Sequence, residues 1–173
     1  MTVAPEIRIR AARTEDAPAL GRLGALLVAL HHDFDAERFI APGPATPHGY
    51  GSFLVSQLDR PDALVLLAED QGEVAGYVYA ALEGNDWMAL RGPAGAIYDL
   101  VVEPHRRRQG VGARLLEHAV KALAALGAPR VVLSTAAKNG AAQSFFAAAG
   151  FRPTMIEMTR ELSKAEGARA GDL

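Results

Sequence analysis

The chain has 173 residues, a formal net charge of -2 and no cysteine, and half of its residues are apolar. This length suits one domain with a full hydrophobic core. The lack of cysteine excludes a disulfide framework, a thiolate zinc site and a cysteine nucleophile. The near-neutral charge disfavours a dedicated nucleic-acid binder. No apolar run reaches the ~18 residues of a membrane span, and the first residues lack the pattern of a signal peptide. We therefore expect a cytoplasmic protein with no nucleic-acid or membrane partner.

The N-terminal half predicts a strand, two helices and a hairpin. Apolar and polar residues alternate at the first strand, whereas leucines at helical spacing mark the first helix. Proline and glycine interrupt the chain between the two helices and predict a loop. The predicted elements are a strand at 7–10, a helix ending near 31, a loop at 41–47, a helix over 50–58, and a hairpin of strands 64–68 and 74–82.

The C-terminal half predicts a β-α-β crossover followed by a further helix and strand. Its predicted elements are a loop at 83–95, a strand at 97–102, a long helix over 115–126, a strand at 131–133, a helix over 141–149 and a last strand at 154–162. Together the elements predict an α/β fold, with helices on both faces of a mixed, mostly antiparallel sheet. We expect one domain over residues 1–162 and a disordered tail over 163–173.

The strongest functional pattern is Arg107-Arg108-Gln109-Gly110-Val111-Gly112-Ala113, which lies between a predicted strand and the start of the long helix. Backbone N–H groups in the first turn of a helix lack partners, and their partial positive charge attracts anions. Glycine lets a phosphate group approach the backbone closely, and arginine adds charge-assisted hydrogen bonds. The pattern predicts a phosphate-binding turn.

Other phosphate-binding motifs fit this turn less well. A dinucleotide fingerprint needs a third glycine where this chain has Leu115, and no Gly-Lys-Ser or Gly-Lys-Thr of a P-loop occurs. A Gly-rich helix start beside a solvated basic turn remains the alternative for the motif taken alone.

Two blocks of the sequence closely resemble the GCN5-related N-acetyltransferase (GNAT) family. The first is the run from Tyr98 to Gly112, which resembles the strand, the Arg/Gln-x-x-Gly-x-Gly/Ala turn and the helix start of that family. The second is Asn139-x-x-Ala142-x-x-Phe145-Phe146-x-x-x-Gly150-Phe151. The resemblance covers residues 64–160 and implies a six- to seven-stranded sheet that splays between the strands 97–102 and 131–133.

The resemblance implies acetyl-CoA as the cosubstrate. Backbone amides would hold its pyrophosphate, arginines would flank it, and Arg106 would reach toward the 3'-phosphate. Backbone groups of one strand would pair with the pantetheine arm. The cofactor-binding residues carried over in this way are Leu100, Val101, Val102, Arg107, Arg108, Gln109, Gly110, Val111, Gly112, Ala113, Asn139 and Phe146. No metal site is implied.

Two catalytic positions of the family are filled here by residues that do not ionise near neutral pH. The usual acid is a tyrosine, where this chain has Phe146, and the peptide-acetylating branch has a glutamate where this chain has Ser134. A protonated amine must lose a proton before it attacks a thioester, so a general base is needed. Either acid assistance is dispensable, or another residue supplies it, or catalysis is weak.

Asp99 is the best remaining base, because a carboxylate in an apolar strand is costly unless it is solvated, paired or functional. An aspartate that pairs with arginine or caps a loop is the structural alternative. Tyr77 and Tyr79 lie two residues apart on one face of a predicted strand and are candidates for the missing acid or for the lining of the acceptor site. Tyr98 is a candidate of the same kind, and Tyr79 and Tyr98 are taken as the further catalytic residues. Core aromatic residues with a solvated hydroxyl are the structural alternative. Acidic residues of the 83–95 loop, Glu83 and Asp86, offer contacts to a cationic amine.

These residues predict an N-acetyltransferase that moves the acetyl group of acetyl-CoA to a primary amine, with a small cationic amine as first choice. The absence of cysteine leaves direct attack in a ternary complex. A peptide or protein N-acetyltransferase is the alternative within the enzyme class, and a non-catalytic acyl-CoA-binding regulatory module is the alternative outside it. The family resemblance also implies a homodimer.

Overall fold

The structure is a computed structural model that describes residues 7–162. The chain divides into two compact units, one up to Ala136 and one from Ala137 onward. The predicted tail over 163–173 lies outside the described residues, and the single domain over 1–162 stays a prediction. None of the helices in the described part is both long and apolar enough to cross a membrane.

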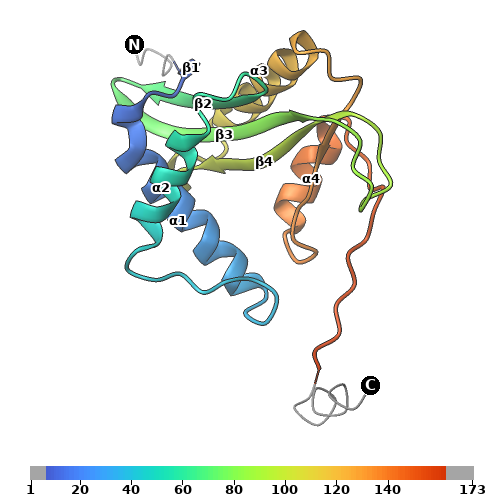
Figure 1. Ribbon diagram of the computed structural model, residues 1–173. Coiled ribbons are helices and arrows are strands. Elements are labelled where there is room, and N and C mark those ends of the chain that lie inside the picture. The colour runs from blue at the N-terminus through green and yellow to red at the C-terminus, as the bar shows by residue number, and fades with distance from the viewer. Residues whose placement is uncertain (1–6, 163–173) are drawn as a thin grey trace. The chain divides into compact units, whose positions relative to one another are not determined.

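The first unit is built on a five-stranded mixed sheet with strand order β1-β2-β3-β4-β5 (Figure 1). Its strands are antiparallel except for the β4–β5 pair, which is parallel. They are β1 (Arg8–Ala11), β2 (Ala63–Asp70), β3 (Glu73–Glu83), β4 (Ala94–Val102) and β5 (Val131–Leu133). The predicted mixed α/β fold is confirmed. The predicted six to seven strands are corrected to five among residues 7–162.

Three α-helices belong to this unit: α1 (Ala17–Phe34), α2 (Thr46–Ser56) and α3 (Val111–Ala125). Short 3-10 turns precede α1 and α3, at Thr14–Asp16 and Pro104–Arg106. The loop predicted over 41–47 is too long, because α2 already begins at Thr46. Pro47 lies in the first turn of the helix, where its missing N–H costs nothing.

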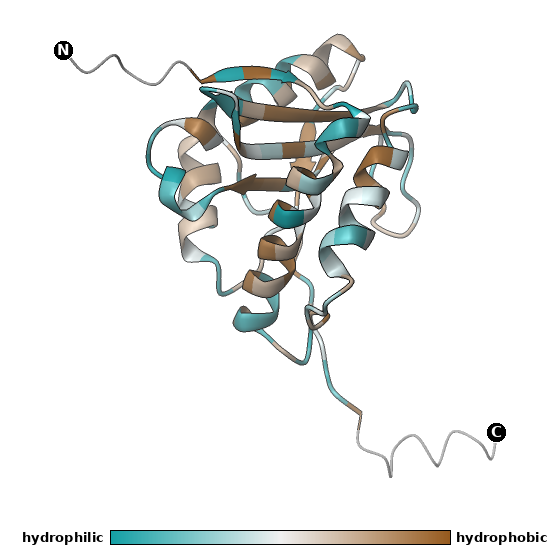
Figure 2. Ribbon diagram, turned by 90° about the vertical axis from the view of Figure 1, so that its left-hand side faces the viewer, coloured by the Kyte–Doolittle hydropathy of each residue, from teal (hydrophilic) through white to brown (hydrophobic). Residues whose placement is uncertain are grey.

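The helices cover the two faces of the sheet, as predicted. Helices α1 and α2 pack with Tyr77 and Tyr79 of β3 in one hydrophobic cluster. Successive residues of a strand point to opposite faces, and a Cβ added to Gly76 or Gly95 would meet leucines of α3 on the other face. In Figure 2 the central strands are brown and the helices carry both colours, as elements with one buried face do.

Helices α1 and α2 approach closely because glycines line their contact. A Cβ on Gly21 would lie 2.0 Å from the carbonyl oxygen of Pro47, and a Cβ on Gly51 would lie 2.4 Å from that of Ala17. A Cβ on Gly24 would lie 2.2 Å from the ring of Tyr50. Since none of these distances leaves room for a Cβ, the glycines set both the helix spacing and the position of Tyr50.

Strand β4 separates from β5 at a bulge. Pairing of β4 with β5 runs only from Gly95 to Ile97. On its other edge β4 pairs with β3, and the register shifts so that Asp99 lies opposite Tyr79 and Ile97 lies opposite Ala80, with Tyr98 as the extra residue. A bulge bends the strand that carries it. The predicted splay is therefore seen as an unpaired β4 edge over residues 98–102.

The second unit contains one regular element in its described part, α4 (Gly140–Ala148). Asn139 caps this helix, because its side-chain oxygen accepts a hydrogen bond from the amide of Ala142 at 3.1 Å. The strand predicted over 154–162 is wrong for this structure, since the segment carries no regular structure. A strand exists only when its backbone groups pair with a neighbour, and no strand of the described chain pairs with this segment.

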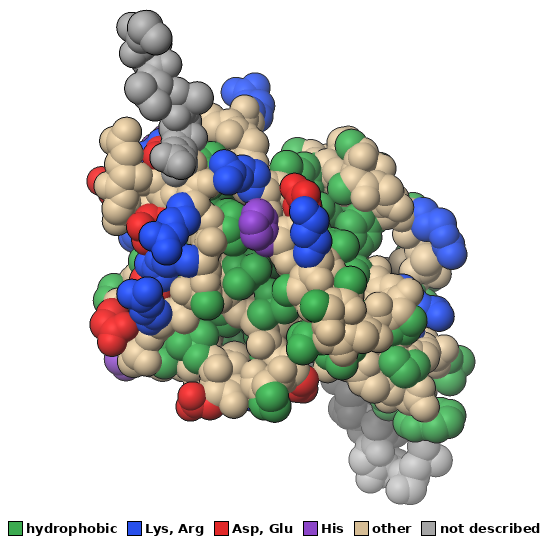
Figure 3. Space-filling view, turned by 90° about the horizontal axis from the view of Figure 1, so that it is seen from above, with side chains coloured by type: hydrophobic (Ala, Val, Ile, Leu, Met, Phe, Trp, Pro, Cys, Tyr) green, Lys and Arg blue, Asp and Glu red, His purple; other side chains and the backbone are tan. Residues whose placement is uncertain are grey.

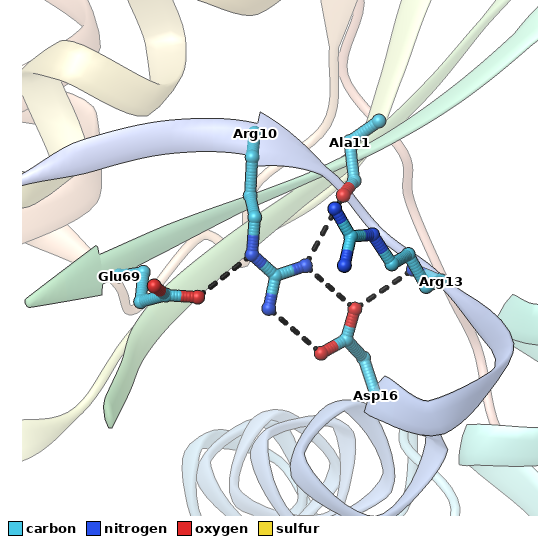
Figure 4. Close-up of polar contacts among 5 residues, drawn as sticks. All are labelled: Arg10, Ala11, Arg13, Asp16 and Glu69. Carbon is cyan, nitrogen blue, oxygen red and sulfur yellow. Dashed lines mark hydrogen bonds and ion pairs between the residues drawn. The ribbon is translucent and has the colours of Figure 1, made fainter. Parts of the chain in front are cut away.

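A charged cluster around Arg10 ties β1 to the start of α1 and to β2 (Figure 4). The guanidinium donates two hydrogen bonds to Asp16, at 2.7 and 2.8 Å, and a third to Glu69 at 2.7 Å. Asp16 also accepts a hydrogen bond from the amide of Arg13. The Arg10 hydrogen bonds are the main cause that lowers the pKa of Asp16, although partial burial acts in the opposite direction.

We expect Asp16→Asn to lower the free energy of unfolding by ~1.5–3 kcal/mol at neutral pH, because charge-assisted hydrogen bonds are lost. The folded pKa of Asp16 lies below its unfolded value of about 3.9. The carboxylate's contribution is therefore present above that value and is lost as pH falls through the folded pKa. Urea unfolding at several pH values measures the difference. Glu15→Gln, at the exposed neighbour of Asp16, is the control. An equal effect of the two substitutions at neutral pH would contradict the prediction.

Candidate functional site

The turn between β4 and α3 presents a row of free backbone amides. Within the described residues, none of the N–H groups from Arg108 to Ala113 donates a hydrogen bond; the first amide of α3 to do so is that of Arg114, which reaches the carbonyl of Gly110 at 3.1 Å. No side chain caps this helix start. Six successive donors at the positive end of a helix dipole form a site for an anion.

Left-handed backbone conformations shape this turn. Arg108 has φ +60° and Gly110 has φ +82°. The turn is held by the side-chain amide of Gln109, which donates to the carbonyl of His105 at 2.9 Å. A left-handed residue inside such a turn directs neighbouring N–H groups toward one side, which makes an anion-binding concavity.

The three consecutive arginines have different roles in the structure. Arg106 donates to Asp70 at 2.6 Å, and the side chain of Asp70 is only 4% exposed. Arg107 and Arg108 are exposed, and Arg107 donates to the backbone carbonyl of Val102 at 3.3 Å. Arg106 therefore ties the turn to the end of β2, which argues against its expected reach toward a 3'-phosphate, whereas Arg107 and Arg108 keep guanidinium groups at the surface.

A second ion pair anchors the end of β4. Buried Glu103 forms an ion pair with Arg22 of α1. The backbone amide of Glu103 donates a hydrogen bond to the carbonyl of Ala75 at 2.9 Å. A hollow of about 480 Å³ adjoins this anchor and is lined in part by Arg22, Glu103 and Arg106. Neither the free amides nor Asp99 lines it. The hollow thus borders the ion-paired residues Arg22, Glu103 and Arg106, which hold the turn in place, and not the free backbone amides of the turn.

Asp99 lies between the sheet and helix α2. It is 7% exposed, and its Oδ2 accepts hydrogen bonds from the hydroxyls of Tyr50 and Tyr77, both at 2.8 Å. Its Oδ1 accepts none from the described residues and is not among the oxygens sealed from solvent. One carboxylate oxygen is thus fixed by two phenols, and the other is free for a further donor.

Burial dominates the acidity of this cluster. It raises the pKa of Asp99 above its ordinary value, while the two tyrosine hydrogen bonds and the nearby His31 lower it. Burial also raises the pKa of Tyr50 and Tyr77, with the Asp99 charge as the second cause. Asp99 is therefore a stronger base than an exposed carboxylate, and the phenols are weaker acids than free tyrosine.

The two other candidate tyrosines lie beside this cluster. Tyr79 is almost buried and donates to the side-chain oxygen of Gln57 at 3.1 Å. Tyr98 is 43% exposed and donates to Glu83. Burial is the main cause that raises the pKa of both phenols. Their hydroxyls are thus held by protein acceptors and are poor proton donors at neutral pH.

Neither Glu83 at the end of β3 nor Asp86 in the β3–β4 loop offers a free carboxylate. Glu83 pairs with Arg91, and Asp86 lies 3.6 Å from the same guanidinium. Asp86 also accepts hydrogen bonds from the amides of Met88 and Ala89. These carboxylates hold the loop in place. No group of three or more His, Asp or Glu side chains in the described residues is arranged to hold a metal ion.

Charges on the surface are mixed. Figure 3 shows basic side chains lying among acidic and apolar ones on the face that it presents. This agrees with a net charge of -2 distributed over both signs.

Comparison with known proteins identifies the family. The model of the "Acetyltransferase (GNAT) family" matches residues 27–151, which include Asp99 and the turn between β4 and α3. The chain belongs to the GNAT family. The predicted family, and with it acyl-CoA-dependent N-acetyl transfer, is confirmed.

Curated relatives and solved structures agree with this assignment. The uncharacterized N-acetyltransferase YhfO of Bacillus subtilis is 28% identical over 147 residues, which are 84% of this chain and 89% of the relative. The aminoalkylphosphonate N-acetyltransferase of Salmonella typhimurium is 28% identical over 164 residues, 92% of this chain and 94% of the relative. The BH1408 protein of Bacillus halodurans, in a mutant structure, superposes with a TM-score of 0.77 at 20% identity and covers 90% of this chain and 99% of its own. That likeness shows the fold.

The second block of this GNAT chain lies in the second unit. The Nδ2 of Asn139 has no acceptor among the described residues, while its Oδ1 caps α4. Phe146 packs its ring against Phe145 and Phe151, with ring centroids 5.2 and 5.7 Å apart. The phenylalanine at the position of the family's usual acid is thus part of a small aromatic cluster.

Sequence reasoning missed Tyr50 and Gln57 as partners in the site. Both come from α2 or its C-terminal end, and their partners are 49 and 22 residues away. The available signal was a tyrosine on the apolar side of a helix, because a buried hydroxyl needs a polar partner. The partner itself is not visible in a single sequence.

We expect Arg106→Ala to lower the free energy of unfolding by ~3–5 kcal/mol, because it leaves the buried Asp70 carboxylate without its cation. Arg107→Ala removes an exposed arginine and should change the same quantity by less than ~0.5 kcal/mol. Urea unfolding of both variants at neutral pH tests this difference between neighbours. Equal stabilities of the two variants would show that Arg106 does not support the turn.

Proposed function

We propose that the chain transfers the acetyl group of acetyl-CoA to a primary amine by direct attack. The observation that carries the proposal is the row of six free amides at the start of α3, next to the unpaired edge of β4. A diphosphate needs several donors in one place, and an extended amide-bearing arm pairs with a free strand edge. Both features lie between residues 98 and 113.

The cosubstrate's contacts follow from these donors. Amides of residues 109–113 face the pyrophosphate, and the exposed Arg107 and Arg108 flank it. Backbone groups of Leu100, Val101 and Val102 pair with the pantetheine arm, because β5 leaves this part of β4 unpaired.

Asp99 is proposed to take the proton from the amine. A primary amine with a pKa of ~10 is protonated at neutral pH, so its deprotonation opposes the attack. The free Oδ1 of Asp99 is the oxygen available for that proton, and Tyr50 and Tyr77 hold the carboxylate in place through Oδ2. Asp99 is therefore the base in this proposal, directly or through one water.

The transfer step needs little acid. The neutral amine nitrogen forms a bond to the thioester carbonyl carbon, the C–S bond breaks, and the sulfur leaves with the electron pair. The nitrogen loses a proton to water as it becomes an amide, and the thiolate takes up one proton, so the step balances. A thiol with a pKa of ~8.5 is a good leaving group. Since every phenol of the site has a raised pKa, the thiolate can leave unassisted and be protonated from water. Tyr79 and Tyr98 then act mainly as walls of the acceptor site.

We expect Asp99→Asn to lower kcat/KM by ~10²–10⁴-fold, the usual contribution of a general base. The wild-type profile of kcat/KM should rise with pH through the raised pKa of Asp99, and the variant should lose that inflection. Thiol release from acetyl-CoA as a function of pH measures both. Unchanged kcat/KM and an unchanged profile would show that Asp99 is not the base.

The hydrogen bond from Tyr50 lowers the pKa of Asp99. Tyr50→Phe should therefore move the acid inflection to higher pH without removing it. Asp59→Asn, at an exposed carboxylate after α2, should leave the profile as it is.

Gly110→Ala tests the anion-binding turn. Gly110 has φ +82° and open space around its missing Cβ, so the cost is backbone strain rather than a clash. The strain of ~1–2 kcal/mol should disturb the free amides and weaken CoA binding by about tenfold. Gly84→Ala, at a glycine with equally open space and no such φ, should leave the affinity unchanged. Calorimetric titration with CoA measures the dissociation constant, and equal affinities of the two variants would contradict the assignment.

Measurements of CoA binding and of thiol release distinguish the proposed acetyltransferase from a non-catalytic acyl-CoA-binding module. Phe146 and Ser134 at two family catalytic positions favour a non-catalytic acyl-CoA-binding module as the second candidate. Thiol release with amines establishes the enzyme. CoA binding without thiol release on any amine would favour the module, and no CoA binding would contradict both.

A further inference from the structure

We propose that the acceptor is a monoamine with an apolar, ring-bearing body, which packs against an aromatic wall formed by Phe53, Tyr79 and Tyr98. This inference rests on the proposed function and specifies its substrate class. It narrows the small cationic amine predicted from the sequence by excluding acceptors with several charges.

The β4 bulge brings the wall and the base together. Tyr98 and Asp99 are consecutive residues, yet both face α2, because Tyr98 is the extra residue of the bulge. The Tyr98 ring lies 4.9 Å from the Tyr79 ring, and Asp99 accepts the hydroxyl of Tyr50. In a regular strand the two side chains would point to opposite faces. An amine that reaches Asp99 at this point of β4 therefore has an aromatic ring beside it.

The wall is continuous and partly exposed. The Phe53 and Tyr79 rings meet edge to face at 5.8 Å, and the Phe53 ring lies 6.2 Å from that of Tyr50. Phe53 is 47% exposed and Tyr98 is 43% exposed. Rings with such neighbours offer an apolar surface to a ligand. The row of rings thus leads from the surface to the phenol that fixes Asp99.

Hydrogen bonds hold the ends of this wall. Tyr98 donates to Glu83, and Tyr79 donates to Gln57, whose side-chain oxygen also accepts from Arg60. A fixed ring loses little conformational entropy when a ligand packs on it. The wall is therefore arranged before the acceptor binds.

The charges around the wall are already paired. Glu83 has Arg91 as its cation, and Asp62 has Arg60 at 2.8 Å. Arg60 and Asp62 act electrostatically on Tyr79, which places this pair beside the wall. No lysine or arginine of the described residues bonds to Asp99 or is among the groups that shift its pKa. Asp99 is thus available for one ammonium, whereas Glu83, Arg91, Arg60 and Asp62 beside the wall pair with one another.

Four amines distinguish the possible acceptor classes in a thiol-release assay with acetyl-CoA and the full chain. 2-Phenylethylamine carries one charge and a ring, and ethylamine carries the charge alone. Spermidine adds further positive charges, and 2-aminoethylphosphonate adds a negative one. We expect kcat/KM for 2-phenylethylamine to exceed that for ethylamine by about tenfold or more, since a phenyl ring leaves water. Spermidine and 2-aminoethylphosphonate should be poorer than 2-phenylethylamine.

Variants of Phe53 connect this selectivity to the wall. Phe53→Ala should lower kcat/KM for 2-phenylethylamine about tenfold, mainly through KM, and leave that for ethylamine unchanged, which also shows that the variant is folded. Phe53→Tyr keeps a ring and should keep the selectivity. Trp87→Ala removes another exposed aromatic ring, on the β3–β4 loop, and should change neither value.

The outcomes distinguish a wrong acceptor class from a wrong proposed function. If spermidine or 2-aminoethylphosphonate has the highest kcat/KM, or if Phe53→Ala lowers the values for both monoamines equally, the acceptor class is wrong while the acetyltransferase stands. If no amine releases thiol and CoA does not bind, the proposed function fails, and the acceptor class fails with it.

Discussion

The backbone of β4 is the constraint on which the site depends. A strand must satisfy the N–H and C=O groups of both edges, and β4 does so fully only as far as Ile97, where β5 ends its pairing. The bulge at Tyr98 then shifts the register with β3, and the two strands pair again from Asp99 onward. The inserted residue lies directly after the last residue that pairs with β5, and it sets a phenol ring and a carboxylate on the same face.

Buried charges connect β2, β4 and the residue after β4 to other elements of the unit. Asp99, Glu103 and Asp70 are all buried, and each contacts a residue from another element: Tyr50 of α2, Arg22 of α1 and Arg106 of the turn. A buried carboxylate without a partner is costly, so these contacts fix relative positions rather than add a large net stability. These contacts tie both helices of one face, α1 and α2, to β4 and to the residue that follows it.

The parts of the site that are local in sequence were predictable. The strand, turn and helix from Tyr98 to Ala113 follow from an apolar run, a Gly-rich turn and helical periodicity, and Asp99 stands out as a charge in an apolar strand. What could not be predicted depends on pairing over long separations. Tyr50 contacts Asp99 across 49 residues and Arg106 contacts Asp70 across 36.

Two errors in the predicted elements have the same origin. The run 154–162 has the composition of a strand but no partner strand in the described chain, and composition alone does not supply one. The start of α2 was set too late because Thr46-Pro47 reads as a loop, although proline suits a first helical turn. The pattern at 154–162 allows a strand or an irregular segment, and the lack of a partner strand among the described residues decides between them. The pattern at Thr46-Pro47 allows a loop or a helix start, and the position of Pro47 in the first turn of α2 decides between them.

The glycines at the contact between α1 and α2 also have a thermodynamic consequence. Gly21, Gly24 and Gly51 have no space for a Cβ, and two of these sites are close contacts of main chain with main chain. Glycine loses more backbone entropy on folding than other residues, so these positions reduce stability by ~0.5–1 kcal/mol each relative to alanine in a helix. Since no larger residue fits, the fold cannot recover that entropy by substitution at these sites. A search for stabilising glycine-to-alanine changes would therefore have to turn to open loop positions without a positive φ, such as Gly84 and Gly92.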